Sequence, residues 1–477
     1  MWTQAIAEHA RTSPGADAVV TPERTVSYGR MAQDLDRFCH RIAALGLPGG
    51  AVVAAWVRDP YLQWLALLAL GRLGFVSFSF FNEPFAELNY ELARPVRVLT
   101  DRPQVGADPR FALIGADWLE AEARPFADAR RDPARPARLQ LSSGTTGKPK
   151  RMLWSQAAVE LRVRNLIDRA MPPCARSLTL FLPQTGLGFA MPLATFVQGG
   201  AVLACDGLYW DASLWTLRPS LLAVTPRHLF EILASLGGDR PGPPPRVMTG
   251  GSMVPRSLQR AAMAKLTHDF HSWYGASEVG MIAHAPPEVL ARHESAAGAL
   301  LPGVEVRILG DAGQPLPPGQ TGKVRLRTQA MATPHPGDPD LFEDGWFAPE
   351  DLGFVTPDGL LVLEGRGGEV MNFGGSKVSA TDVESAAMSA PGVLDAAAFS
   401  MPGPRGLPIL WVAVKTGPGY AEAALRSAIA PAARVKPVMV AQLRQIPRNA
   451  AGKIQRNLLA GLVRGRAGRR PAGPPRR

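Results

Sequence analysis

Apolar residues follow two alternating patterns along the first part of the chain. Residues 28–47 have apolar positions at helical spacing and end near Gly46, a plausible helix C-cap, and the run at 50–57 then has the character of a buried strand. The same pair repeats at 61–74 and 75–80. Because helices and buried strands alternate, the sequence predicts an α/β fold with a largely parallel sheet.

The alternation continues through the middle of the chain and then changes. Further buried strands are expected at four places, 177–183, 201–205, 221–225 and 246–251. A helix is expected at 226–237. After residue 296, short strand-like segments are separated by turn residues, which indicates antiparallel β structure.

A glycine-rich run separates this β region from the end of the chain. The segment EGRGGE at 364–369 is either a hinge or a tight turn. The ~110 residues after it are enough for a small α+β domain. We therefore expect a large N-terminal domain of stacked α/β sheets over 1–366, with a β subdomain at about 297–364. A small mobile C-terminal α+β domain is expected over 369–462, before an Arg/Pro-rich tail at 463–477.

Composition narrows the class of protein. The chain has 477 residues, of which 46% are hydrophobic and 19% charged, and this balance is typical of a soluble globular protein. Its three cysteines are far apart without CxxC spacing, so neither a disulfide framework nor a zinc site is indicated. The N-terminus lacks a basic segment followed by an apolar run, and no stretch is apolar for ~18 residues. These features predict a cytoplasmic protein without an integral membrane segment.

The formal net charge is +11, and part of it lies in the tail RGRAGRRPAGPPRR. A basic tail attracts nucleic acid, anionic lipid or an acidic protein, or is simply solvated. Here the arginines are interleaved with Gly and Pro rather than with aromatic residues, so no platform for base stacking is visible. The solvated tail is the favoured interpretation, and no nucleic-acid partner is expected.

The segment LSSGTTGKPK at 141–150 is rich in groups that bind phosphate. A Walker A loop needs four residues between its glycines and a Ser or Thr after the Lys. Here Gly144 and Gly147 have two residues between them, and Lys148 is followed by Pro149, so a P-loop NTPase is excluded. Backbone N–H groups, hydroxyls and lysines can still converge on an anion. The alternative interpretation is a flexible Ser/Gly linker.

Four further segments accompany the loop in a fixed order. They are VMTGGSMVP at 247–255, WYGASEVG at 273–280, the stretch 344–384 and IPRNAAGKIQRNLL at 446–459. Together with the loop they resemble the signature motifs of the adenylate-forming superfamily, which contains acyl-CoA synthetases, peptide-synthetase adenylation domains and luciferases. The resemblance extends from about residue 1 to about residue 460, and five ordered motifs are far more specific than any one of them.

The resemblance implies a reaction in two halves. A carboxylate attacks the α-phosphate of ATP to give an acyl-AMP and pyrophosphate, and a thiol then displaces AMP. Such a site must neutralise the charge that develops on the phosphates and keep water from a reactive anhydride. The implied cofactors are ATP and Mg²⁺, with CoA or phosphopantetheine as the thiol co-substrate.

The motifs also imply a role for individual residues. The catalytic candidates are Lys453, which reaches the substrate carboxylate and α-phosphate, and Glu278, which holds Mg²⁺ together with Thr146. Nucleotide binding is assigned to Ser142, Ser143, Gly144, Thr145, Thr146, Gly147, Lys150, Gly250, Gly251, Tyr274, Gly275, Ala276, Ser277, Asp351 and Arg366. The acyl pocket is assigned to Gln184, Gly186, Phe189, Ser252, Val279 and Met281. The thiol side is assigned to Gly374, Gly375 and Lys377, and the hinge to Gly368.

Within these roles, Thr145, Thr146 and Lys150 hold the β- and γ-phosphates, and Ser277 donates to the α-phosphate. The Tyr274 ring packs on adenine, and Asp351 with Arg366 binds the ribose hydroxyls, for which a carboxylate is a good acceptor. Taken without the other motifs, Tyr274 is more simply a core aromatic residue, and Lys453 a solvated lysine.

Three positions depart from the family pattern. Pro349 and Glu350 stand where Thr-Gly usually precedes the ribose-binding Asp, and the extra carboxylate weakens ATP binding if it repels the phosphates. The hinge position, commonly Asp or Lys, is Gly368. Gly186 lies at or near the place of a pocket His, which changes the shape of the acid pocket or of the thiol tunnel.

The leading hypothesis is an ATP-dependent acid:thiol ligase that passes an aryl or fatty acid to CoA, because the expected pocket segments are mostly apolar. A close alternative is a ligase that loads a carrier protein, whose acidic surface suits the positive net charge. A third is a binding protein on the same scaffold without turnover.

Overall fold

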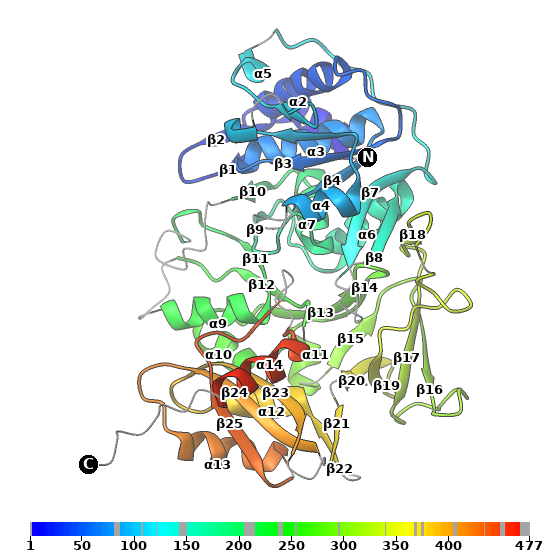
Figure 1. Cartoon of the computed structure of the whole chain (residues 1–477). Helices are drawn as coiled ribbons and strands as arrows, with labels where there is room; N and C mark the ends of the chain where they lie inside the picture. Colours follow the sequence, from blue (N-terminus) through cyan, green and yellow to red (C-terminus); the bar gives the residue numbers. More distant parts are fainter. Residues whose placement is uncertain are drawn as a thin grey trace.

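The computed structural model describes most of the chain. The residues outside the description are 1, 81–85, 106–107, 121, 143–149, 205–214, 237–241, 253, 255, 294–295, 339, 367–369, 374–375, 404–407, 434, 449–453 and 468–477. The fold is a mixed α/β architecture of two large sheets with a smaller C-terminal region, as the alternation of elements predicts (Figure 1).

A seven-stranded sheet carries the strand that leads into the segment expected to bind phosphate. Strands β7, β4, β3, β5 and β6 are parallel, and β8 and β18 extend the sheet antiparallel beyond β7. In sheet order the strands are β18 (Thr333–Pro334), β8 (Lys150–Ser155), β7 (Pro136–Ser142), β4 (Val76–Ser79), β3 (Val52–Trp56), β5 (Arg97–Thr100) and β6 (Phe111–Leu113).

A thirteen-stranded sheet carries most of the other motifs. Its parallel part is β13 (Phe270–Ala276), β12 (Arg246–Thr249), β11 (Leu221–Val224), β9 (Arg176–Thr179), β10 (Ala201–Leu203) and β1 (Asp17–Val20), and β2 (Thr25–Ser27) closes that edge. Beyond β13 the sheet continues antiparallel through β14 (Gly280–Ala285), β15 (Ala296–Leu300), β20 (Leu360–Arg366), β19 (Asp351–Val355), β17 (Gly322–Arg327) and β16 (Glu305–Leu309). The β region expected after residue 296 is therefore antiparallel, and it continues the main sheet.

Helices cover both faces of the large sheet. One apolar core joins residues of both sheets with α1 (Trp2–Thr12), α2 (Tyr28–Ala43), α3 (Pro60–Leu73), α6 (Gln156–Arg169) and α7 (Gly186–Val197). A second core packs α9 (Pro226–Ser235), α10 (Arg256–Lys265) and α11 (Pro287–Arg292) on the large sheet. Two shorter helices, α4 (Ala86–Ala93) and α5 (Asp117–Glu120), lie near the seven-stranded sheet.

Several helix ends follow directly from the sequence. The hydroxyl of Ser27 caps α2 by accepting from the N–H of Arg30, and Asp59 caps α3 just before Pro60. Gly74 ends α3 in the left-handed conformation at φ +83°, which glycine adopts without steric cost. The observed bounds of α2 and α3 lie within four residues of the positions expected from the sequence.

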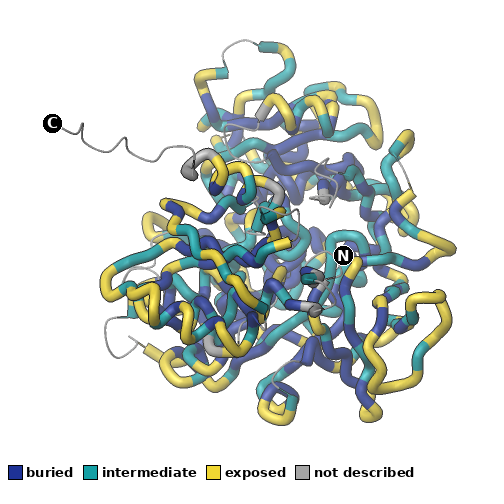
Figure 2. The backbone as a smooth tube through the Cα atoms, turned by 60° about the horizontal axis from the view of Figure 1, so that its bottom comes forward, coloured by how far each residue is buried: buried dark blue, intermediate teal, exposed yellow. Residues whose placement is uncertain are grey.

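The C-terminal region has its own small sheets and core. The hairpin of β21 (Val370–Phe373) and β22 (Ser376–Ser379) precedes a three-stranded sheet of β23 (Val393–Pro402), β24 (Pro408–Thr416) and β25 (Val438–Gln442). Helices α12 (Ala380–Met388), α13 (Glu422–Ala433) and α14 (Arg456–Ala467) complete the region. Its buried residues form clusters separate from those of the large sheets, so this part has a core of its own (Figures 1 and 2).

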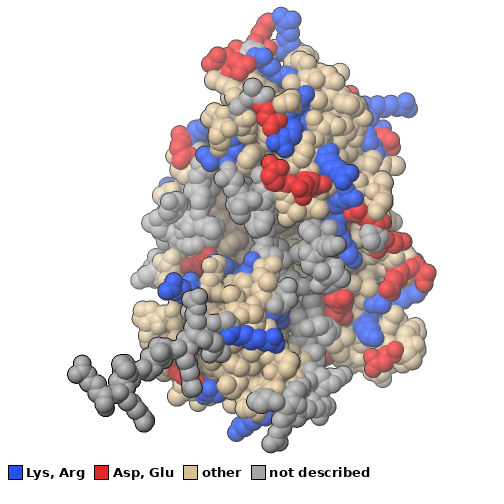
Figure 3. All heavy atoms as spheres, in the orientation of Figure 1, with Lys and Arg blue, Asp and Glu red and all other residues tan. Residues whose placement is uncertain are grey.

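Charged side chains of both signs lie on one face of the molecule. On the face shown in Figure 3, Lys and Arg side chains are interspersed with Asp and Glu. Among the described residues, no helix is both long and apolar enough to span a membrane.

Candidate active site

The candidate site lies where strands of the large sheet end. Gly250 and Gly251 follow β12, Ser277 and Glu278 follow β13, and the turn before α7 follows β9. Carboxyl ends of neighbouring parallel strands meet at one edge of a sheet, where ligands bind in open α/β folds. Motifs that are far apart in the sequence therefore meet at one edge.

Two glycines after β12 allow aromatic side chains to approach the backbone. A Cβ on Gly250 would lie 2.4 Å from Cε2 of Trp273, so a larger residue here would displace the indole. Gly251 adopts φ +83°, and a Cβ there would lie 3.3 Å from the Phe181 ring. The Phe181 and Trp273 rings are 6.1 Å apart, which gives this part of the site an aromatic wall.

The hairpin of β13 and β14 brings the nucleotide candidates together. The Tyr274 hydroxyl donates to Oδ2 of Asp351 at 2.5 Å, and Asp351 is only 5% exposed. Asp351 lies opposite Arg366 in the antiparallel register of β19 and β20. A Cβ on Gly275 would lie 2.2 Å from the carbonyl oxygen of Gly280, so the bulge beside Tyr274 accepts only glycine. The structure thus unites Tyr274 with the expected ribose-binding carboxylate.

The turn that carries Ser277 and Glu278 is held through its backbone. Nε1 of Trp154 donates to the carbonyl of Ser277 at 3.1 Å, and the N–H of Ala332 donates to that of Glu278 at 2.7 Å. Arg162 also donates to the Glu278 carbonyl, at 3.4 Å, and its guanidinium lies 4.0 Å from the centre of the Trp154 ring. Burial lowers the pKa of Arg162 to about 9, and the Glu278 carboxylate opposes this shift, so the guanidinium stays charged at neutral pH. Trp154 and Arg162 were not expected from the sequence, because neither lies in one of the five motifs.

Three of the residues expected to line the acid pocket lie in the turn before α7 and in its first turn; this region is called the acid side below. A Cβ on Gly186 would lie 3.3 Å from Cη2 of Trp154 and 3.9 Å from Oγ of Ser277, so Gly186 adjoins the nucleotide motif. Phe189, one turn later, is 4% exposed, and its ring centre is 6.4 Å from that of Trp154. Gln184 is also buried, at 6% exposure.

The other expected acid-pocket residues are dispersed. Met281 packs in the same core as Phe189 and Trp154. Val279 is fully buried in a different core, with Val324 and Leu326. Ser252 is exposed. Of the six candidates, Gln184, Gly186 and Phe189 are neighbours along the turn and first part of α7.

The segment expected to bind phosphate, 141–150, is described only at its ends. Ser142 and Lys150 are register partners at the end of the β7–β8 ladder, so the loop closes a hairpin, and Lys150 is partly buried. Residues Ser143, Gly144, Thr145, Thr146, Gly147, Gly368, Gly374, Gly375 and Lys453 lie outside the described residues. The side chains of Ser142, Arg366 and Lys377 lie outside the description as well.

The residues of the candidate site suit a Mg²⁺ ion that is bound partly by the phosphates of the substrate. No group of three or more His, Cys, Asp or Glu residues that could bind a metal occurs in the described part of the chain. Mg²⁺ is commonly held by one or two carboxylates together with substrate phosphates, and Glu278 beside Ser277 can supply such a carboxylate.

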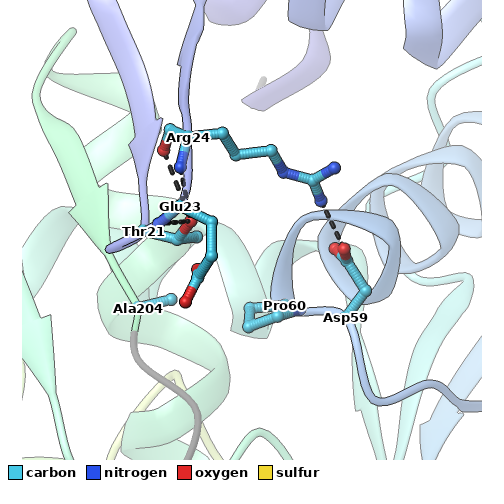
Figure 4. A pocket seen from close by; sticks show the side chains of 6 residues that line it. All are labelled: Thr21, Glu23, Arg24, Asp59, Pro60 and Ala204. Atoms are coloured by element: carbon cyan, nitrogen blue, oxygen red, sulfur yellow. Dashed lines mark hydrogen bonds and ion pairs between the residues drawn. The ribbon is translucent and has the colours of Figure 1, made fainter.

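A separate cavity of about 210 Å³ lies between β1–β2 and the start of α3 (Figure 4). Its lining is Thr21, Glu23, Arg24, Asp59, Pro60 and Ala204. Asp59 is already engaged there, because it pairs with Arg24 and caps α3. None of these residues belongs to the candidate active site.

Comparisons with known proteins agree with the arrangement. The family described as AMP-binding enzyme matches residues 85–334. Indoleacetate–CoA ligase of Aromatoleum aromaticum is 27% identical over 96% of this chain and 97% of its own. The fatty acid–[acyl-carrier-protein] ligase ScoC of Streptomyces coeruleorubidus is 25% identical over 94% of each chain.

The fold is also that of solved structures in the same group. The crystal structure of an anthranilate CoA ligase in complex with anthranoyl-AMP superposes with a TM-score of 0.83 at 18% identity, over 98% of each chain. Because the family match covers more than half of the sequence, the chain belongs to the AMP-binding enzyme family of the adenylate-forming superfamily and is an acyl-CoA synthetase-like acid–thiol ligase.

Proposed function

We propose that this enzyme activates an aryl or fatty carboxylic acid with ATP and transfers the acyl group to CoA. The observation that carries the proposal is the meeting of two unlike surfaces at Ser277. On one side, the buried Asp351 carboxylate accepts from Tyr274, and Asp351 is the register partner of Arg366 in the β19–β20 ladder. On the other, Gly186, Phe189 and Trp154 form an apolar wall. A nucleotide and an apolar acid placed there would have their reacting groups at the Ser277 turn.

In the first half-reaction, a carboxylate oxygen of the acid bonds to the α-phosphorus and the bond to pyrophosphate breaks. Ser277 donates to the α-phosphate, and Lys453 brings its cation to the carboxylate and the same phosphate. Thr145, Thr146 and Lys150 bind the β- and γ-phosphates, while Asp351 and Arg366 fix the ribose. Glu278, together with Thr146, would hold Mg²⁺, which when bound would neutralise charge on the phosphate oxygens.

In the second half-reaction, the thiol sulfur bonds to the acyl carbon and AMP leaves. Admitting the thiol requires that one part of the enzyme moves relative to another. We therefore propose a large part over 1–366, which includes a β subdomain at about 297–364, and a small part over 369–462. Gly368 is the hinge between them, and the tail is 463–477. Gly374 and Gly375 let a pantetheine arm approach the backbone, and Lys377 lies beside that path. The separate core of the C-terminal region supports such a division, because a part with its own core can move as a unit.

Carrier-protein loading is the second candidate. The net charge of +11 favours an acidic protein surface, and the relative ScoC is named for transfer to a carrier protein. A homologue without turnover is the third. Glu350 supports it, since a carboxylate now precedes Asp351 where the family usually has glycine.

The deciding experiment measures ATP–pyrophosphate exchange across a panel of aryl, fatty and amino acids. We expect exchange with an aryl or fatty acid and none with Asp351→Asn, which keeps the side-chain shape but removes the charge that binds ribose. Robust exchange with any acid eliminates the non-turnover homologue. The best acid is then offered with CoA or with a phosphopantetheinylated carrier protein, and the product with the higher kcat/KM identifies the acceptor. Absence of both thioesters would overturn the ligase assignment.

A further inference from the structure

Strand β7 contains two polar side chains that are buried although they belong to no motif. Arg138 is 0% exposed and Gln140 is 2% exposed. Leu139 and Leu141, which alternate with them, pack in an apolar core on the opposite face of the strand. The strand is therefore covered on both faces, and one covered face is lined by an arginine and a glutamine.

Both side chains contact the turn before α7. Nη2 of Arg138 donates to the carbonyl of Pro183 at 2.8 Å and to Oγ of Ser79 at 3.0 Å. Nε2 of Gln140 donates to the carbonyl of Gln184. Two consecutive carbonyls of the turn are thus bound by two alternating residues of one strand, and the register between β7 and the turn is set.

The Arg138 guanidinium also packs on the acid side of the candidate site. It lies 4.3 Å from the centre of the Phe189 ring. Phe189 in turn packs near Trp154, which bonds to the Ser277 carbonyl. Arg138 therefore contacts the turn through its hydrogen bond and the first turn of α7 through the Phe189 ring.

The contacts of Arg138 and Gln140 join two segments to which the proposed function gives a role. β7 continues past Arg138 and Gln140 to Ser142, where the proposed phosphate-binding loop begins. The turn runs from Pro183 to Gly186, which adjoins Oγ of Ser277. Thr185 stabilises the turn by donating to the carbonyl of Leu182 at 2.8 Å and by accepting from the N–H of Gly188 at 3.2 Å.

The energetics argue that Arg138 is not there for stability. Among the described residues, Nε and Nη1 of Arg138 and Oε1 of Gln140 have no hydrogen-bond partner. Burial lowers the pKa of Arg138 to about 9, and no carboxylate in the described part of the chain opposes this shift. A buried cation without a carboxylate partner destabilises a fold, and an apolar side chain of similar size is often as good or better.

We propose that Arg138 and Gln140 are positioning residues that fix the turn 183–186 against β7 and thereby set the acid pocket relative to the phosphate-binding loop. The functional part of this inference rests on the proposed function. Its structural part does not, since it concerns how the turn is held in the free enzyme.

The structural part is tested by amide hydrogen exchange on the ligand-free full chain. Arg138→Met and Gln140→Met should each speed exchange in the segment 183–189 by about tenfold, which is the effect of losing a hydrogen bond. Arg102→Met is the matched control, because Arg102 is also buried, at 7% exposure, and lies 4.3 Å from the Trp56 ring centre, but away from α7. Unchanged protection of 183–189, or equal loss in the Arg102 variant, would overturn the proposal.

The functional part is tested by pyrophosphate exchange with the acid that the wild type activates best. Arg138→Met should raise the KM for the acid by about tenfold and shift the preference within the panel, with the KM for ATP changed less than about twofold. Arg138→Lys, which keeps one donor and the charge, should recover part of the acid KM. A lower melting temperature with unchanged selectivity would show a merely structural role and overturn the functional part. A wild type without exchange would instead refute the proposed function, and hydrogen exchange would still decide the structural part.

Discussion

The contact between Tyr274 and Asp351 is the most informative at the residue scale. A hydrogen bond to a charged acceptor contributes ~1.5–3 kcal/mol, and here it also fixes the direction of the carboxylate. Tyr274→Phe should therefore raise the KM for ATP in pyrophosphate exchange by about five- to tenfold, with a smaller effect on the KM for the acid.

The matched control is Tyr28→Phe. Its hydroxyl also donates in a buried position, to the carbonyl of Gly200 at 2.7 Å, but far from the nucleotide candidates in sequence and in fold. This variant should lose stability and keep both KM values. If the two variants changed the KM for ATP equally, Tyr274 would have no special role in nucleotide binding.

Glu350 is one of five described non-glycine residues with a positive φ, and it lies next to the expected ribose-binding Asp351. It adopts φ +64° at a position where the family usually has glycine, and a non-glycine residue in this region costs about 1 kcal/mol. Glu350→Gly should raise the melting temperature and lower the KM for ATP, because strain and a carboxylate next to Asp351 are both removed. Glu350→Gln removes the charge alone and should lower the KM without the gain in stability. A KM for ATP that rises in both variants would contradict the repulsion hypothesis.

At the scale of elements, the β13–β14 hairpin carries a buried pair of histidines behind the site. The His271 and His284 rings are stacked with centres 5.0 Å apart, and Nδ1 of His271 lies 2.8 Å from Nε2 of His284. Nε2 of His271 lies 2.6 Å from Oδ1 of Asp269, which also pairs with Arg246. Both hydrogen bonds can form with neutral rings if His284 donates to His271 and His271 donates to Asp269.

Acid should weaken this hairpin. Burial, with smaller effects of His271 and nearby arginines, lowers the pKa of His284 to about 4. In the unfolded chain a histidine titrates near 6.5, so between about pH 6.5 and 4 the unfolded state binds a proton that the folded state does not. The part of the unfolding free energy that His284 contributes above pH ~6.5 is lost as the pH falls toward 4, and it amounts to about 3 kcal/mol.

His284→Gln keeps a donor toward His271 without the titrating group. Urea unfolding at pH 7.5 and 4.5 should show a smaller loss of unfolding free energy in this variant than in the wild type, by about 2 kcal/mol. An identical loss in both proteins would refute the role of His284. Burial also lowers the pKa of His228 to about 4 and lowers that of His271, so part of the acid sensitivity should remain.

At the scale of the whole molecule, the separate C-terminal core makes relative movement of two parts the natural hypothesis. Lys453→Ala should abolish acyl-AMP formation but spare thiolysis of supplied acyl-AMP, because the proposed function gives Lys453 a role only in the first half-reaction. Lys415→Ala, an exposed lysine in the same region, is the control and should preserve both half-reactions. Equal loss of both half-reactions in Lys453→Ala would refute the proposal that the C-terminal part moves between them.

Much of this molecule was predictable from local patterns. The helices and strands that were expected before residue 296 begin and end near their expected positions, because the spacing of apolar residues and the capping groups are local properties. The motifs placed Tyr274, Ser277, Asp351 and Gly186 in one site on the basis of their order, and the structure brings Tyr274 to Asp351 and Gly186 to Ser277. Glycine spacing alone excluded a Walker A loop.

Other features depended on which distant segments meet. The alternation Arg138, Leu139, Gln140, Leu141 is typical of a strand with one solvent face, yet α7 and its turn cover that face. Trp154 and Arg162 support the Ser277 turn from positions more than a hundred residues away in sequence. Val279 lies in the turn before β14 and packs in a different core from Met281, which lies within that strand, so strand alternation does not relate the two side chains.

The sequence by itself determined the α/β class, the order of the motifs and the chemistry that they serve, since these depend on residue type and spacing. Only the tertiary structure decided how the antiparallel strands continue the main sheet, which carboxylate meets Tyr274, and which buried polar groups hold the acid-side turn. Each of these is a choice of partner between segments distant in the chain. Such choices are fixed by packing and strand register, which no local pattern encodes.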